Sequence, residues 1–253
     1  QTLNLKLSHR FSEKSKLVFQ LNSTDSPYAY DAGSLNIDEV KSNRTMARQK
    51  NIDYKTKETI KHLKTGLSWM LDIDNQTDIQ SFVFYQHRDF YSLLPFNFGG
   101  IVSLDKNIFG IGSRLQKKKI KDNLINTFQL GFDYMNQKDQ RDRYRNDFGE
   151  QGENVFSQQE NFSSLGIYAL NQIEFENGIL FRLGSRFDSN KISTDNNNQS
   201  IFLNKINPSF GITYNTNNKS NFFMTVGTSF ETPTLNELSN NPNGGMGFNK
   251  DLE

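Results

Sequence analysis

The feature that most constrains this chain is an alternation of apolar and polar residues with a period of two, which recurs in about ten segments. Residues 124–134 illustrate it: the even-numbered positions are apolar except Asn126, and the odd-numbered positions from Thr127 onward are polar or glycine. Successive side chains of a β-strand point to opposite faces, so the pattern predicts strands with one apolar face. The predicted strands cover residues 2–8, 16–22, 61–69, 79–86, 108–115, 124–134, 164–173, 179–188, 206–214 and 222–226.

The composition fits a sheet that has a single apolar face. Hydrophobic residues make up only 34% of the 253 residues and the mean hydropathy is -0.70, yet 13% of the residues are aromatic, unlike in a disordered chain. A transmembrane barrel combines these properties, because its lipid face is apolar while its loops and lumen are polar. No apolar run approaches the roughly 18 residues of a membrane-spanning helix. Strands are therefore the predicted membrane-crossing elements.

The predicted connections alternate between short and long. The short ones are residues 10–15, 71–78, 116–122, 174–178 and 215–220, and the long ones are residues 23–58, 88–99, 135–160 and 189–200. In outer-membrane barrels short turns lie at the periplasmic rim and long loops at the extracellular rim. We therefore predict an all-β fold, an antiparallel up-and-down transmembrane β-barrel. A soluble β-sandwich or propeller is the alternative, although neither has a reason to sort its connections by length.

Signals for catalysis and metal binding are weak. The chain has no Cys, which excludes disulfides and thiolate metal ligands. His9, His62 and His87 fall on separate predicted strands or their ends, without metal-ligand spacing. The Gly-Ile-Gly run at 110–112 lacks the third glycine of a nucleotide fingerprint, and we assign it to strand packing. The 29 Lys and Arg balance 28 Asp and Glu, which gives no sign of a nucleic-acid partner. We expect no enzymatic activity, no cofactor and no metal site.

Two charged segments are candidates for ligand contact. Arg141, Arg143 and Arg145 lie in the predicted loop 135–160, which is either a solvated loop or an anion-binding one, because Arg forks suit carboxylates and phosphates. The lysine-rich run 117–121 is interpreted as a solvated hairpin turn, with contact to anionic lipid headgroups as the alternative.

Aromatic and strand-borne charged residues supply further candidates. The aromatic ones lie near predicted strand ends and in loops: Tyr28, Tyr30, Phe90, Tyr91 and Phe96. Interface girdles account for many such residues in barrels, and lining a ligand vestibule is the alternative. Arg182, Arg186 and Asp188 occupy the polar face of the strand 179–188 and are expected to face the lumen. Charges inside a barrel usually pair with one another or with whatever fills the lumen.

One segment resembles a known family. Residues 227–238 read Gly-Thr-Ser-Phe-Glu-Thr-Pro-Thr-Leu-Asn-Glu-Leu, which is similar to the Phe-x-x-Pro-Thr-x-x-Glu-Leu signature of TonB-dependent receptors. The matching residues are Phe230, Pro233, Thr234, Glu237 and Leu238. Segments 33–44, 178–188, 240–245 and 248–253 are also similar to phrases of the family, in its Bacteroidetes-like form.

The matching residues have a structural interpretation. Pro233 cannot donate to a sheet ladder and so marks where strand pairing ends. Phe230 suits the membrane interface at the rim, where barrels place aromatic residues. Glu237 is expected to accept hydrogen bonds from a loop or turn backbone. We therefore expect this segment to hold the loop at a strand exit rather than to contact ligand.

The resemblance implies a barrel of about 22 strands around an N-terminal plug, in the outer membrane of a Gram-negative bacterium. Residues 1–253 are then one barrel segment, cut at both ends from a longer protein and lacking the plug and the C-terminal strands. The implied function is active import into the periplasm of a scarce ligand, ferric siderophore-type first. The implied partners are this ligand, outer-membrane lipid, and the TonB complex acting through the plug.

Two other functions remain open from the sequence: a passive porin-like channel and a soluble β-sheet carbohydrate-binding module. A porin would share the strand pattern, whereas a soluble module would need a second layer over its apolar faces. About ten strands of a larger barrel would leave two unpaired edges, so we expect the chain alone to be unstable.

Overall fold

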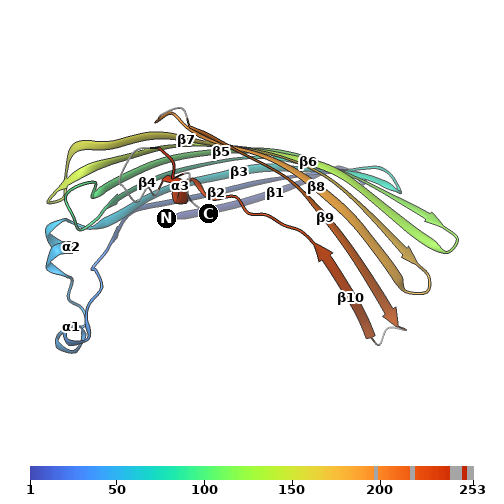
Figure 1. Cartoon of the computed structure of the whole chain (residues 1–253), viewed down its shortest axis with the longest axis horizontal. Coiled ribbons are helices and arrows are strands. Elements are labelled where there is room, and N and C mark those ends of the chain that lie inside the picture. The colour runs from blue at the N-terminus through green and yellow to red at the C-terminus, as the bar shows by residue number, and fades with distance from the viewer. Residues whose placement is uncertain (197–198, 217–219, 240–246, 250–253) are drawn as a thin grey trace.

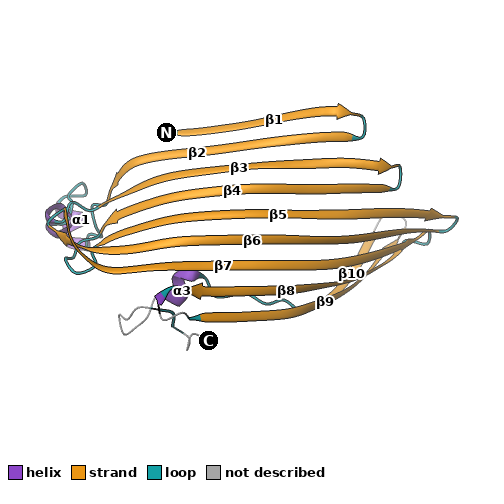
Figure 2. Cartoon of the chain, turned by 90° about the horizontal axis from the view of Figure 1, so that it is seen from above, coloured by secondary structure: helices purple, strands orange, loops and turns teal. Residues whose placement is uncertain are grey.

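The computed structural model describes residues 1–196, 199–216, 220–239 and 247–249. Its dominant element is one antiparallel ten-stranded sheet, in which each strand pairs with the next along the chain (Figure 2). The strands are β1 (Thr2–Ser12), β2 (Ser15–Tyr30), β3 (Lys57–Asp74), β4 (Thr77–Leu93), β5 (Ile101–Lys121), β6 (Leu124–Asp147), β7 (Glu150–Phe175), β8 (Ile179–Thr194), β9 (Ser200–Thr216) and β10 (Ser220–Gly227). The sheet forms an open arch with β1 and β10 at its edges (Figure 1).

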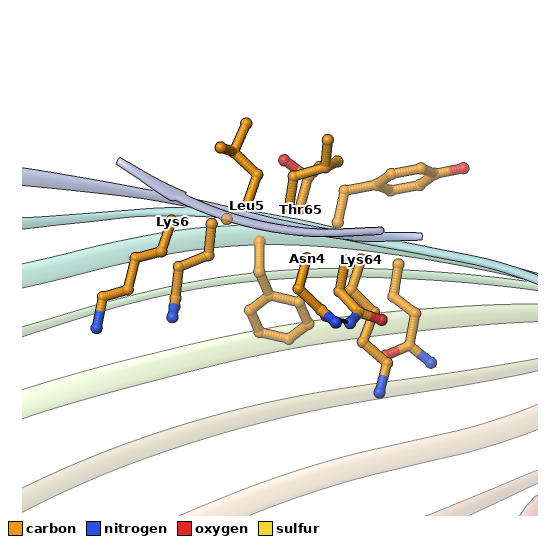
Figure 3. Close-up of a pocket in the computed structure, with 12 residues that line it drawn as sticks. Asn4, Leu5, Lys6, Lys64 and Thr65 are labelled. Carbon is orange, nitrogen blue, oxygen red and sulfur yellow. Dashed lines mark hydrogen bonds between the residues drawn. The ribbon is translucent and has the colours of Figure 1, made fainter. Parts of the chain in front are cut away.

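The two faces of the arch differ in polarity. Leu5 and Thr65 project from the convex side, whereas Asn4, Lys6 and Lys64 project from the concave side (Figure 3). The residues that share the convex face with Leu5 are largely apolar and exposed, among them Leu7, Leu67, Trp69, Phe128, Leu130, Phe132, Ile167, Phe181, Leu183 and Phe210. In the described chain they are covered by neither a helix nor a second sheet. The soluble sandwich considered above is therefore wrong.

The apolar belt on the convex face has the height of a membrane. On β6 the convex positions are apolar at Phe128, Leu130, Phe132 and Tyr134, and they turn polar from Asn136 onward. With Leu124 and Asn126 at its lower edge, this run approaches the roughly 9–11 residues with which a tilted strand crosses the hydrocarbon core. Because β6 has 24 residues and β7 has 26, both strands continue far beyond the belt at one end.

All ten predicted strands are present, but several are longer than the sequence indicated. The predicted loop 135–160 is wrong: β6 continues to Asp147, β7 begins at Glu150, and only Phe148 and Gly149 turn the chain. Above the membrane neither face of a strand needs to be apolar, so the period-two signal is lost while the hydrogen-bonded ladder continues. The lysine-rich run at 117–121 is likewise the end of β5 and not a turn.

The two ends of the sheet carry different connections. At one end the turns are short, and the short connection predicted at 174–178 is confirmed as a tight turn over residues 176–178, in which Gly178 has a φ of 82°. At the other end residues 31–56 form a long connection that contains α1 (Ile37–Ser42) and α2 (Gln49–Asp53). The predicted alternation is confirmed for the long connections that follow β2 and β4, but not for the tight turn between β6 and β7. The predicted long connection 189–200 is also wrong in its bounds, because β8 continues to Thr194 and β9 begins at Ser200.

The predicted strand 79–86 has apolar residues on both of its faces, and the neighbouring strand β5 explains this. On the concave face the rings of Phe82 and Phe84 lie over Gly112 and Gly110 of β5, where an added Cβ would meet ring atoms at 2.6 Å and 2.2 Å. Aromatic rings beside strand glycines fill the space that the missing side chains leave. The apolar residues of β4 therefore serve both faces, and the packing role assigned to Gly110 and Gly112 is confirmed.

One short helix, α3 (Leu235–Ser239), lies beneath the arch on its concave side (Figure 1). Leu235 and Leu238 pack with Ile192 and Phe248 in the one buried apolar cluster of the described residues. No helix in the described part of the chain has both the length and the apolar content needed to cross a bilayer.

Candidate functional site

The concave wall carries a row of charged side chains that crosses five neighbouring strands. The strand register places His62, Arg88, Lys106, Asp139 and Glu160 beside one another on β3 to β7. Residues directly opposed across a ladder share a face of the sheet, with Cβ atoms about 4.5–5.5 Å apart. The row is therefore continuous, basic on β3 to β5 and acidic on β6 and β7.

The basic half of the row has unused hydrogen-bonding capacity. Nε2 of His62 and Nε of Arg88 are both buried, and neither has a hydrogen-bond partner within the described chain. The guanidinium carbon of Arg88 lies 5.5 Å from the ring centroid of Phe90, and Lys64 adds a further cation on the same face of β3. Buried polar groups are normally paired. These nitrogens can therefore receive an acceptor that comes from outside the described chain.

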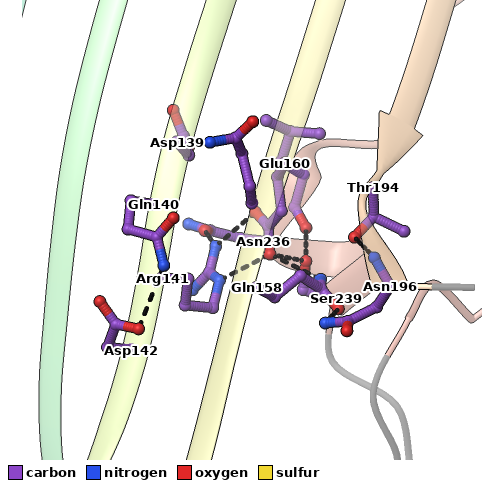
Figure 4. Close-up of polar contacts among 12 residues, drawn as sticks. Asp139, Gln140, Arg141, Asp142, Gln158, Glu160, Thr194, Asn196, Asn236 and Ser239 are labelled. Atoms are coloured by element: carbon purple, nitrogen blue, oxygen red, sulfur yellow. Dashed lines mark hydrogen bonds and ion pairs between the residues drawn. The ribbon is translucent and has the colours of Figure 1, made fainter. Parts of the chain in front are cut away.

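The acidic half is internally neutralised. Lys106 Nζ lies 3.3 Å from Oδ2 of Asp139, whose side chain is fully buried. Arg141, one step further along β6, donates from Nε to Glu160 Oε1 at 2.8 Å and from Nη2 to Glu160 Oε2 at 3.1 Å. Gln158 also donates to Glu160 Oε1, at 3.0 Å. The carboxylate on β7 is thus fixed from two sides (Figure 4).

The segment that follows β10 docks onto this pair. Arg141 Nη2 donates a hydrogen bond to Asn236 Oδ1, and the Ser239 hydroxyl donates to Glu160 Oε1. Both α3 residues point at the β6–β7 wall in Figure 4. Since Asn236 and Ser239 come from the C-terminal part of the chain, the Arg141–Glu160 pair joins segments far apart in sequence.

A capping box organises the start of α3. The Thr234 backbone N–H donates to Glu237 Oε2 at 2.7 Å, and the Glu237 N–H donates to Thr234 Oγ1 at 3.2 Å. The hydrogen bond from the Thr234 backbone holds the pKa of the Glu237 carboxyl below its ordinary value. Pro233 lies past the end of β10 at Gly227, where strand pairing has stopped. The capping box therefore turns Leu235 and Leu238 toward the wall.

A second charged cluster lies on the concave wall, closer to the short-turn end of the sheet than the row described above. Arg186 donates from Nη1 and Nη2 to the two oxygens of Asp133 at 2.7 Å and 2.8 Å, and from Nε to Asp188 at 2.7 Å. Arg186 and Asp188 line a cavity of about 500 Å³ together with Phe230. On the same strand, Arg182 donates to Gln172 Oε1 at 3.1 Å. Arg182, Arg186 and Asp188 of β8 are therefore all paired with other side chains of the wall.

The three arginines expected in a loop lie instead along β6 and do not form one cluster. Arg141 is bound to Glu160, and Arg143 lies beside Gly99 in the connection 94–100. Arg145 is 3.7 Å from Glu153 and lies over the Phe98 ring. The structure thus separates residues that the sequence grouped, because a strand spaces alternate side chains about 6.6 Å apart.

The aromatic candidates are also dispersed. Tyr28 and Tyr30 are exposed near the end of β2, with ring centroids 5.7 Å apart. Phe90 lies under Arg88 on β4, and Tyr91 donates to Gln151 at 3.1 Å. Phe96 is exposed in the connection 94–100. Only Phe90 belongs to the charged row.

Sequence reasoning missed the row itself. The sequence indicates His62 as a polar residue of the lumen or rim, puts Arg88 in the predicted connection 88–99, and puts Glu160 at the end of the predicted loop 135–160. No local spacing links these residues, since their proximity depends on the register of the five strands β3 to β7. Residues 240–245 and 250–253, which resemble phrases of the family, lie outside the described residues.

Comparison with known proteins gives one family and a set of solved folds. The chain matches the family described as TonB dependent receptor-like, beta-barrel, over residues 4–253. Similar solved structures include the ferric citrate transporter FecA in its unliganded form, with a TM-score of 0.74 and 16% identity over 89% of this chain and 35% of that chain. The alcaligin receptor FauA from Bordetella pertussis gives a TM-score of 0.67 and 10% identity over 88% and 34%, respectively. The copper transporter OprC gives a TM-score of 0.64 and 10% identity over 94% of this chain and 37% of that chain. The chain therefore spans about a third of each of these proteins, and at such identities the likeness establishes the fold.

Proposed function

Because the chain belongs to the family of TonB-dependent receptor β-barrels, we propose that it forms part of the wall of a receptor that imports a scarce anionic ligand, of the ferric siderophore type. Members of this family lie in the outer membrane of Gram-negative bacteria and are not enzymes. The apolar belt on the convex face agrees with that location. Import into the periplasm would use the TonB complex acting through a plug inside the barrel.

The observation that carries the proposal is the basic half of the concave row. His62, Lys64 and Arg88 lie close together on the concave face of β3 and β4, and two of their nitrogens are buried without a partner in the described chain. An anionic chelate would supply the acceptors that these nitrogens lack, since hydrogen bonds to ionised groups are about twice as strong as neutral ones. Ferric siderophores with carboxylate or catecholate arms offer such acceptors.

The named structures agree with a metal-related ligand without fixing it. They include a ferric citrate transporter, an alcaligin receptor and a copper transporter. The same fold therefore serves several ligands, and the choice among them depends on side chains of the wall and the loops. For this chain the basic half of the row favours an anion over a bare metal cation.

Binding measurements on the intact receptor test the proposal. We would titrate ferric citrate, a ferric catecholate and a ferric hydroxamate against wild type and an H62Q/R88Q variant. The matched control is K61Q/K138Q, which removes two cations from the convex side of the same wall. We expect the Kd of the preferred chelate to rise at least tenfold in H62Q/R88Q and to stay unchanged in the control. No binding of any chelate by wild type, or equal affinity in both variants, would overturn it.

A further inference from the structure

Three lysines form a row on the outer side of the wall, where β5 leaves the membrane belt. Lys117, Lys119 and Lys121 occupy alternate, exposed positions at the short-turn end of β5. They share a face with Leu115 and Phe109, which are exposed on the convex side, whereas Gly110 and Gly112 are covered on the concave side. The three ammonium groups therefore project outward, toward lipid.

The row begins where the belt ends. Lys117 is paired in register with Phe128 of β6 and Thr77 of β4, and Lys119 is paired with Asn126. Leu115 lies one step closer to the belt centre, and alternate residues of a strand are about 6.6 Å apart. The first lysine therefore lies at the edge of the hydrocarbon, and the other two lie at headgroup depth.

No carboxylate of the described chain forms an ion pair with this row, although the charge of Asp74 interacts with that of Lys117 over a longer distance. None of the three lysines takes part in an ion pair within residues 1–196, 199–216, 220–239 and 247–249. The nearby carboxylate of Asp78 accepts from Arg114 and Gln116 instead. Asp74 accepts a hydrogen bond from the Gln76 backbone within its own turn. Three like charges in one line thus need anions from the surroundings.

We propose that Lys117, Lys119 and Lys121 bind the phosphate groups of anionic phospholipids in the periplasmic leaflet. The short turns of an outer-membrane barrel face the periplasm, which places the row in that leaflet. Lysine stems lie along apolar surface while the ammonium reaches the headgroups. The adjoining belt residues Leu115 and Phe128 would contact the acyl chains of the same lipids. This site is independent of ligand uptake through the lumen.

Native mass spectrometry of the intact receptor tests the lipid site. The receptor is incubated with equal amounts of phosphatidylglycerol and phosphatidylcholine that carry the same acyl chains, and the retained lipids are counted. Each lysine near a membrane surface favours anionic lipid by about fivefold. We expect wild type to retain more phosphatidylglycerol than phosphatidylcholine. In K117Q/K119Q/K121Q the ratio of the two retained lipids should be at least about tenfold lower.

The control removes the same charge from the other end of the outer face. K57Q/K61Q/K138Q changes three convex lysines beyond the belt at the long-connection end and should keep the preference. K117R/K119R/K121R should also keep it, which separates charge from folding defects. The proposal is overturned if both glutamine variants behave alike or if wild type shows no preference for phosphatidylglycerol.

Discussion

Arg141 of β6 forms a bidentate ion pair with Glu160 of β7, in which Nε lies 2.8 Å from Oε1 and Nη2 lies 3.1 Å from Oε2. The Glu160 side chain is fully buried. The same two side chains contact Asn236 and Ser239 of α3. An ion pair in the wall is therefore also the anchor of the segment that carries the family signature.

Breaking this pair from one side should be more harmful than removing it. Arg141→Leu leaves a buried carboxylate without its partner, which costs about 3–5 kcal/mol, whereas R141L/E160L removes both charges and costs much less. We expect hydrogen exchange of residues 235–239 to accelerate strongly in R141L and less in the double variant. Chemical denaturation of the intact receptor should follow the same order.

An exposed pair on the same hairpin supplies the control for that experiment. Arg145 and Glu153 are 3.7 Å apart, with side chains that are 44% and 76% exposed. Surface pairs of this kind contribute about 0–1 kcal/mol, so Arg145→Leu should leave exchange in α3 at the wild-type rate. If R145L and R141L have equal effects, the pair does not anchor α3.

The capping box of α3 should make its docking sensitive to acid. The pKa of Glu237 is depressed by the hydrogen bond from the Thr234 backbone, so its contribution is complete above the ordinary carboxyl pKa. That contribution is lost as the pH falls through the lowered value. The chain has no Cys, so a spin label at Glu231→Cys can report the mobility of this segment. We expect mobility to rise on acidification.

Glu237→Gln isolates the carboxyl responsible for the pH effect. In that variant the acceptor charge is absent at every pH, so the label should already be more mobile at neutral pH. Its response to acidification should be flatter than that of the otherwise wild-type labelled chain. Superimposable pH profiles of the two proteins would show that another group controls the segment.

The strand pattern was readable from the sequence wherever the membrane imposes it. Between Leu124 and Tyr134 hydrocarbon on one side and a polar lumen on the other force the period of two, and there the predicted strand and its orientation are right. Beyond Asn136 both faces meet polar surroundings, so nothing local distinguishes a strand from a loop. For that reason the sequence does not predict that β6 and β7 continue as a hairpin beyond the membrane belt.

The candidate site depends on contacts that no local pattern encodes. His62 and Arg88 are 26 positions apart in the numbering and become neighbours only through the register of β3 and β4. The family signature predicted a structural role for Glu237, and the structure places it in a capping box. Its docking partner, the Arg141–Glu160 pair, lay inside a segment that the sequence indicated as loop.

The apolar belt gives a prediction about membrane stability. Leu130 lies at the centre of the belt on β6 and is 46% exposed in the described chain. An arginine at the bilayer midplane costs about 2–4 kcal/mol, and the cost falls to about 0–1 kcal/mol near the interface. Leu130→Arg should therefore destabilise the receptor in urea titrations in phospholipid vesicles, while Asn136→Arg on the same face should be nearly neutral. Equal effects would place the belt elsewhere.

Asn146 should control the order of the long connection at the opposite rim. Its fully buried side chain donates to the carbonyl oxygens of Tyr54 and Leu94 at 3.1 Å and 2.9 Å, and it accepts from the Gly149 N–H at 2.7 Å. Asn146→Ala removes this partner from three partly buried backbone groups, and each lost hydrogen bond costs about 0.5–1.5 kcal/mol. We expect faster proteolysis and hydrogen exchange within residues 31–56, because Tyr54 ties that connection to the hairpin. Asn136→Ala on the same strand is the matched control and should leave both rates unchanged; wild-type rates in N146A would mean that the connection is held by other contacts.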